Sequence, residues 1–236
     1  MERHQDSFTS RVLERPVEYL WFGSSGRPLV TFPTASGRYW ENEDFLLIDC
    51  VKDKIEAGEL QVCCIDAYSD DTWNNNTLHP SGRVKLHDAV DRMWSEELFP
   101  MVAARAGRDD TIVYGASMGG FHAVNFAARH PEQVSRCIAF SGMFDTRRLL
   151  DGHWDDLAYY HCPVCYVPAM DEDWCNRMRT VEWVIATGEE DSIVKETREF
   201  SDILRQKNIP VHSEIWPGVF GHDWPFWREH LPQFVP

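Results

Sequence analysis

Gly115-Ala116-Ser117-Met118-Gly119 constrains the architecture of this chain more than any other stretch. An apolar run of four residues comes directly before this G-x-S-x-G pentapeptide, and a helical pattern follows it. A serine at a sharp turn from strand to helix is held in a strained conformation that exposes its hydroxyl. Its neighbours must be small because the strand and the helix nearly touch. We therefore predict a nucleophile elbow at Ser117.

Around this elbow, apolar and β-branched runs alternate with helical patterns, which indicates an α/β fold with a mostly parallel central sheet flanked by helices. We expect the α/β-hydrolase arrangement, with residues 1–236 forming a single domain. The expected strands are 17–22, 29–32, 60–65, 111–114, 134–140, 181–187 and 211–215. The expected helices are 44–56, 84–106, 118–129, 192–207 and 225–234.

Composition argues against several classes of partner. The formal net charge is -15, which disfavours nucleic acid and anionic membranes because both are bound mainly through Lys and Arg. No apolar stretch approaches the ~20 residues that a membrane span needs, and the polar N-terminal residues lack the apolar core of a signal peptide. We expect a cytoplasmic protein without a membrane association, and the oligomeric state is open.

The chain has seven cysteines, an odd number that favours reduced thiols over a disulfide framework. Cys162 and Cys165 form one Cys-x-x-Cys pair, and with His161 and Cys175 they could bind zinc. A zinc ribbon needs a second such pair. We therefore expect packed thiols, with no metal and no other cofactor.

Ser117 needs a general base that is itself oriented by an acid, and in this fold the partners follow in the order serine, acid, histidine. Of ten histidines, His222 alone follows the last expected strand in a turn, and Gly221 allows that turn to be tight. His222 is therefore the predicted base. The other histidines have simpler expected places: His122 packs on the sheet, His87, His130 and His230 lie on solvated helix faces, and His79 and His161 line the pocket.

The acid has competing candidates. Asp191 follows the strand at 181–187, which is the usual position of the acid in this order of elements, whereas Asp145 comes one strand earlier. Glu189 and Glu190 lie close to Asp191 in the chain. We predict Asp191 and keep Glu190 as the alternative.

An oxyanion hole requires two backbone amides that point at the oxygen of the substrate carbonyl. The residue after the nucleophile, Met118, supplies one at the start of a helix. The small-residue loop after the strand at 29–32 is placed to supply the other, and we expect Ala35 to donate it, with Ser36 as the second choice.

Two aromatic-rich loops follow strands and are therefore expected above the carboxyl edge of the sheet, where they would wall a pocket over Ser117. One contains Trp73, and the other, at about 141–180, contains Trp154 and Tyr160. We predict that these three side chains bind substrate and that the second loop is a cap-like insert. The alternative is that the aromatics only pack the loops onto the domain.

Taken together, four segments resemble the putative esterase family of the α/β-hydrolase superfamily, which includes esterase D-like carboxylesterases and the related mycolyltransferases. They are 32–38, 115–123, 187–191 and 221–227, and the resemblance extends over about 17–234. It implies acyl-ester hydrolysis with Ser117 as nucleophile, Asp191 as acid and His222 as base.

We therefore expect a metal-independent serine carboxylesterase that hydrolyses short-acyl, small-molecule esters through an acyl-enzyme on Ser117. Two alternatives stay open. An acyltransferase or a thioesterase would use the same covalent intermediate, and a non-catalytic binding module would keep the fold without the chemistry.

Overall fold

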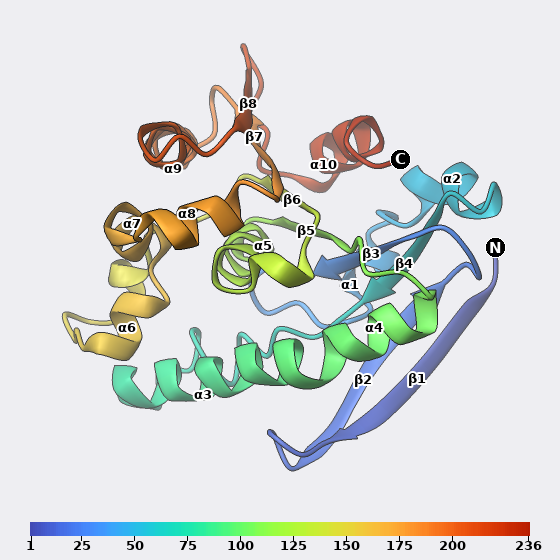
Figure 1. Cartoon of the computed structure of the whole chain (residues 1–236), viewed down its shortest axis with the longest axis horizontal. Helices are drawn as coiled ribbons and strands as arrows, with labels where there is room; N and C mark the ends of the chain where they lie inside the picture. Colours follow the sequence, from blue (N-terminus) through green and yellow to red (C-terminus); the bar gives the residue numbers. More distant parts are fainter.

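A computed structural model describes residues 1–236, and its eight strands form one sheet in the order β1-β2-β4-β3-β5-β6-β7-β8 (Figure 1). Neighbouring strands from β4 through β3 to β8 are parallel, while β1 and β2 pair antiparallel at one edge. The predicted mostly parallel α/β fold is therefore confirmed. The strands are β1 Arg3–Ser10, β2 Arg15–Phe22, β3 Arg27–Phe32, β4 Leu60–Cys64, β5 Ile112–Ala116, β6 Arg136–Phe140, β7 Glu182–Gly188 and β8 Val211–Trp216.

The seven expected strands are present, each within two residues of its predicted ends. The eighth, β1, was not predicted. It reads Arg-His-Gln-Asp-Ser-Phe-Thr-Ser, lies at the edge of the sheet and buries only Ser10. An exposed edge strand has no apolar alternation from which it could be recognised, and polar side chains there discourage pairing with other chains.

Nine α-helices lie between the strands, and a tenth follows the last one. They are α1 Glu41–Asp44, α2 Lys52–Glu56, α3 Pro80–Met93, α4 Phe99–Ala106, α5 Met118–Arg129, α6 Asp156–Tyr160, α7 Pro163–Tyr166, α8 Glu172–Met178, α9 Val194–Gln206 and α10 Trp224–His230. Helix α5 has its predicted bounds. The helix expected at 44–56 is interrupted because Leu46 has a left-handed φ of 60°. The one expected at 84–106 begins at Pro80 and contains a π-helical stretch, Trp94–Leu98, between α3 and α4.

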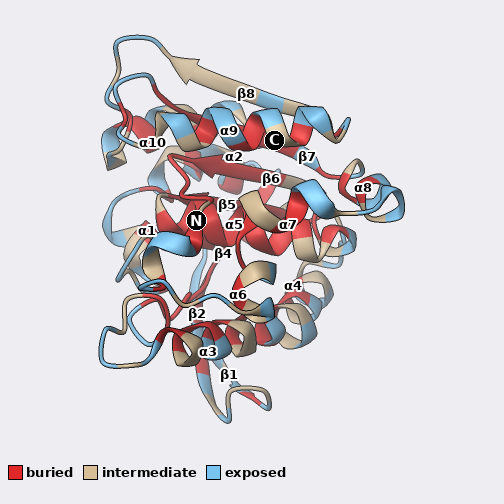
Figure 2. Ribbon diagram, turned by 90° about the vertical axis from the view of Figure 1, so that its left-hand side faces the viewer, coloured by how far each residue is buried: buried red, intermediate tan, exposed pale blue.

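Helices cover both faces of the sheet (Figure 1). On one face, α4, α5 and α9 pack around a cluster of 34 buried apolar residues, and on the other α2 and α10 enclose a second cluster of 22. Figure 2 shows the strands in the middle of the molecule as almost wholly buried. Because the central strands are parallel, their carboxyl ends lie at one edge, and the loops that carry Ala35, Ser117, Asp191 and His222 all leave from that edge.

Candidate active site

Ser117 lies at the turn between β5 and α5, with φ 56° and ψ -122°. A positive φ is costly for a residue other than glycine and is maintained only where the surroundings impose it. The surroundings here are the small residues of the pentapeptide. A Cβ added at Gly115 would lie 1.9 Å from the carbonyl oxygen of Gly119. Strand and helix are therefore in direct backbone contact, and the elbow has the strained geometry that the pentapeptide predicts.

His222 lies between Ser117 and Asp191. Its Nε2 atom is 3.0 Å from the Ser117 hydroxyl oxygen, and its Nδ1 atom is 3.1 Å from both carboxylate oxygens of Asp191. The Asp191 side chain is fully buried, whereas about a quarter of the His222 side chain is exposed. The structure thus brings together the three residues that the sequence singles out, in hydrogen-bond contact.

The buried Asp191 carboxylate also accepts hydrogen bonds from the Thr187 hydroxyl at 2.7 Å and from the backbone amide of Ile193 at 3.1 Å. Burial alone raises the pKa of this carboxyl group. The hydrogen bonds from His222, Thr187 and Ile193 favour the charged form and outweigh burial, so that the pKa lies below its usual value. Asp191 is therefore an anion facing the imidazole.

The competing acids lie elsewhere. Glu190 is exposed, and its backbone amide donates to the carbonyl oxygen of Val219. Asp145 forms two hydrogen bonds with the Arg147 guanidinium, at 2.6 and 2.8 Å. Only Asp191, among the acids considered from the sequence, is hydrogen-bonded to His222.

The turn that presents His222 is held by residues that sequence reasoning missed. Ser141 donates its hydroxyl to the carbonyl oxygen of Gly221 at 2.7 Å, and the Trp227 indole N–H donates to the same oxygen at 3.1 Å. A Cβ at Gly221, whose φ is 73°, would lie 2.3 Å from the backbone nitrogen of Gly188. Loop and strand end are therefore packed backbone to backbone. The only feature of the sequence that could have indicated a role for Ser141 is its position directly after β6.

The two amides expected to form the oxyanion hole lie on adjoining segments. Met118 is the first residue of α5, where backbone N–H groups have no acceptor within the helix. Ala35 is exposed, and its amide has no hydrogen-bond partner in the protein. A Cβ at Gly119 would lie 2.6 Å from the carbonyl oxygen of Pro33. The loop therefore touches the first turn of α5, beside the nucleophile.

Trp73 does not line an open pocket. Its side chain is 1% exposed and packs against Phe121 and His87, with ring centroids 5.5 and 4.9 Å apart. It belongs to a buried apolar cluster that also contains Met118 and Met143. The prediction that Trp73 binds substrate does not fit this arrangement, because a ring that is 1% exposed has no surface left for a ligand.

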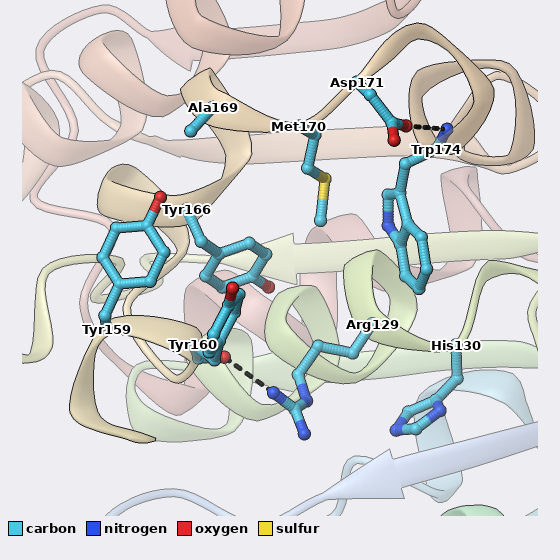
Figure 3. Close-up of a pocket in the computed structure, with 9 residues that line it drawn as sticks. All are labelled: Arg129, His130, Tyr159, Tyr160, Tyr166, Ala169, Met170, Asp171 and Trp174. Carbon is cyan, nitrogen blue, oxygen red and sulfur yellow. Dashed lines mark hydrogen bonds between the residues drawn. The ribbon is translucent and has the colours of Figure 1, made fainter. Parts of the chain in front are cut away.

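Trp154 and Tyr160 are exposed, and they line hollows to which Ser117, Asp191 and His222 do not contribute. Tyr160 lines a groove of about 520 Å³, and its carbonyl oxygen accepts a hydrogen bond from Arg129 (Figure 3). Arg129 ends α5, and Ser117 precedes its first residue, so the twelve residues of the helix separate them by about 18 Å. Trp154 lines a neighbouring hollow with Tyr160. The insert at 141–180 thus places Tyr160 at the far end of α5, with Trp154 in the neighbouring hollow.

The other histidines divide between expected and unexpected positions. His122 is buried against the sheet, and burial lowers its pKa to about 3. His87, expected on a solvated face, is fully buried, and both its ring nitrogens lack partners. His161, expected in the pocket, is buried between Asn125 and Asp88. The side of α3 that carries His87 packs against α5 and the residues around α6, because the His87 ring contacts Phe121 and His161.

All seven cysteines are free thiols. No group of three or more His, Cys, Asp or Glu side chains is arranged to hold a metal ion. The residues weighed as zinc ligands, Cys162, Cys165, Cys175 and His161, therefore do not form a ligand set. None of the helices has the length and apolar character needed to cross a membrane.

Comparisons with known proteins identify the family and the fold. The model of the family described as "Putative esterase" matches residues 64–236. A comparison with curated protein sequences finds no match. The family match confirms the resemblance seen in the sequence and supports ester hydrolysis in general.

Solved structures of several esterases share the fold. A ferulic acid esterase superposes with a TM-score of 0.77 at 22% identity, over 100% of this chain and 96% of its own. S-formylglutathione hydrolase (FrmB) from Staphylococcus aureus gives 0.68 at 16% identity, over 98% of this chain and 94% of its own. Mycobacterium tuberculosis MPT51 (FbpC1) gives 0.68 at 15%, over 99% and 89%. At such identities the likeness establishes the α/β-hydrolase fold.

Proposed function

Because this chain belongs to the putative esterase family, we propose that it is a serine carboxylesterase that works through an acyl-enzyme on Ser117. The observation that carries the proposal is the position of the His222 imidazole. It lies within hydrogen-bond distance of the Ser117 hydroxyl on one side and of the buried Asp191 carboxylate on the other. A serine hydroxyl is protonated at neutral pH, and such a pair is what makes it nucleophilic.

In the proposed reaction, the Ser117 oxygen attacks the ester carbonyl carbon while Nε2 of His222 takes the hydroxyl proton. The tetrahedral intermediate then collapses, its bond to the alcohol oxygen breaks, and His222 returns the proton to that oxygen. Water attacks the acyl-enzyme by the same route and regenerates Ser117. Asp191 keeps the Nδ1–H of His222 directed toward itself, so that Nε2 is free to accept a proton.

The proposed oxyanion hole consists of the Met118 and Ala35 amides. The first turn of α5 adds the positive end of a helix dipole next to Ser117. The contact between the Gly119 backbone and the Pro33 carbonyl supports this assignment, since it holds the two segments together. No metal or organic cofactor takes part in the proposed chemistry.

We further infer a preference for short acyl groups. Met118 and Met143 are almost wholly buried, and they pack with Trp73 and Phe121 in a cluster next to the nucleophile. Packed interiors accommodate extra methylenes only at a cost of ~1–3 kcal/mol. A series of nitrophenyl esters from acetate to palmitate should therefore show its highest kcat/KM at the short end, and a maximum at long chains would contradict the inference.

The proposed function is tested with nitrophenyl acetate and a fluorophosphonate probe. The wild-type protein should hydrolyse the ester and react covalently with the probe, and Ser117→Ala should do neither. Removing the nucleophile of a serine protease costs about 10⁶-fold in kcat. Ser7→Ala, an exposed serine on β1, is the matched control and should keep full activity. Wild-type hydrolysis by Ser117→Ala would refute the proposal.

Partitioning of the acyl group distinguishes hydrolysis from transfer. Added alcohol competes with water for the acyl-enzyme, and a carboxylesterase should release mainly the free acid at low alcohol concentration. Predominant formation of a new ester would instead indicate an acyltransferase.

A further inference from the structure

The segment that follows β3 carries the exposed Ala35 amide and is anchored by a side chain from α1. Glu41, the first residue of that helix, accepts a hydrogen bond from the Thr34 backbone amide at 2.7 Å through Oε2. Its other oxygen, Oε1, accepts one from the Thr34 hydroxyl at 2.7 Å. Thr34 directly precedes Ala35. Both oxygens of one carboxylate are therefore committed to the residue next to the proposed oxyanion donor.

The loop is shaped around this carboxylate. A Cβ added at Gly37 would lie 2.3 Å from Oε2 of Glu41, so that only glycine leaves space for it. Burial raises the pKa of Glu41 above its ordinary value, and the two hydrogen bonds from Thr34 offset only part of that rise. The next residue, Asn42, donates its side-chain amide to the Thr31 hydroxyl at 3.2 Å, which ties α1 to the end of β3.

The same loop contains a strained residue. Ser36 has a left-handed φ of 61°, and its hydroxyl donates to Asp70 at 2.6 Å. Such a conformation persists only where contacts impose it. On its other side, the loop meets the first turn of α5, because Gly119 is in contact with the Pro33 carbonyl. The loop is thus fixed on one side by the hydrogen bonds between Thr34 and Glu41, and on the other by the backbone contact of Pro33 with α5.

We propose that Glu41 is a positioning residue of the oxyanion hole. Its carboxylate accepts two hydrogen bonds from Thr34 and thereby keeps the Ala35 amide directed at the site beside Ser117. This inference rests on the proposed function, and it adds a residue that does not touch the substrate. An oxyanion exists only in the transition state and the tetrahedral intermediate. Loss of the two hydrogen bonds between Thr34 and Glu41 should therefore lower kcat and leave KM nearly unchanged.

The test compares two substitutions at the same position. Glu41→Ala removes both acceptors. Glu41→Gln keeps the shape, because its amide oxygen can accept from the Thr34 N–H while its NH2 group donates to the Thr34 hydroxyl. A misplacement of about 1 Å can cost ~10²-fold. We expect kcat for nitrophenyl acetate to fall by about 10²-fold in Glu41→Ala with KM within threefold, and to recover most of that loss in Glu41→Gln.

Glu43→Ala is the matched control, because Glu43 belongs to the same helix but pairs with Arg3 at the surface. It should leave kcat and KM at wild-type values. Binding of a trifluoromethyl ketone, which forms a tetrahedral adduct with the nucleophile, should weaken in Glu41→Ala in proportion to kcat. A purely structural role for Glu41 would lower the active fraction without changing the inhibitor affinity of the folded remainder.

The outcomes separate the two proposals. If the wild-type protein hydrolyses no ester, the proposed function fails. If it does, and Glu41→Ala matches wild type in kcat and inhibitor affinity, the role of Glu41 is refuted. Should Glu41→Ala fail to fold, Thr34→Val removes only the hydroxyl contact and should still lower kcat at constant KM, and an unchanged kcat there would equally overturn the role.

Discussion

Asparagine at position 191 should disable the candidate active site while leaving its shape intact. Asp191 accepts hydrogen bonds from three donors, which are the imidazole of His222, the Thr187 hydroxyl and the Ile193 amide. Asparagine has a single side-chain oxygen and adds an NH2 group. The Ile193 amide can only donate, so it retains the oxygen at the place of Oδ1 and the NH2 group takes the place of Oδ2. There the NH2 group can donate to the Thr187 hydroxyl, and it faces Nδ1 of His222.

Such contact stabilises the wrong imidazole tautomer. Nδ1 then accepts a proton from the amide, Nε2 carries the ring proton, and Ser117 loses its base. The corresponding change in a serine protease lowers kcat about 10⁴-fold. We expect the same scale here, which corresponds to about 5 kcal/mol of activation free energy.

Asp145→Asn is the matched control. Asp145 pairs with Arg147 at the surface, and such exposed pairs contribute about 1 kcal/mol or less to stability. The assay is kcat/KM for nitrophenyl acetate, with circular dichroism to verify folding. Asp191→Asn should lose about 10⁴-fold and Asp145→Asn should be unaffected. Equal losses in the two variants, or a larger loss in Asp145→Asn, would refute the assignment of the acid.

Three further changes test other parts of the structure. Gly115→Ala places a Cβ 1.9 Å from the Gly119 carbonyl oxygen and should lower the free energy of unfolding by at least ~3 kcal/mol, so an unchanged urea midpoint would contradict the elbow packing. Burial lowers the pKa of His87 and His122, the latter to about 3. Below pH ~6.5 the unfolded chain therefore binds more protons, and stability should fall as pH decreases from there, whereas a flat profile down to pH 4 would argue against neutral buried imidazoles. Tyr160→Ala should leave kcat/KM for nitrophenyl acetate unchanged, and a large loss would place its groove at the active site after all.

The parts of the site that follow strand ends could be predicted from the sequence. Ser117 comes directly after β5, and Asp191 and His222 lie in the loops that follow β7 and β8. Parallel strands bring their carboxyl ends to one edge of the sheet. The order of these residues along the chain was therefore enough to predict that they meet. The choice between Asp191 and Glu190 as the acid, however, depended on the contacts of Asp191 with His222 in the structure.

The aromatic insert could not be placed from the sequence. A connection between parallel strands begins at the carboxyl edge and must return to the opposite edge before the next strand starts. Tyr160, at the middle of the connection between β6 and β7, and Trp174, in its second half, therefore lie near the far end of α5. Periodicity does not reveal where along this path each side chain falls.

Glu41 shows a similar limit. It belongs to the charged run Glu41-Asn42-Glu43-Asp44, and such a run usually indicates a solvated helix face. Nothing in the pattern distinguishes the half-buried Glu41, which binds Thr34, from the neighbouring Glu43, which pairs with Arg3. The difference arises from the tertiary fold alone.

The most direct test of covalent catalysis by Ser117 is to trap the acyl-enzyme. The protein is mixed with nitrophenyl acetate, quenched in acid within the first turnovers, digested and examined by mass spectrometry. We expect one acetyl group on the peptide that contains Ser117, located on that serine, together with a burst of nitrophenol equal to the enzyme concentration. Steady turnover with no burst and no acetyl group on Ser117 would contradict covalent catalysis by this residue.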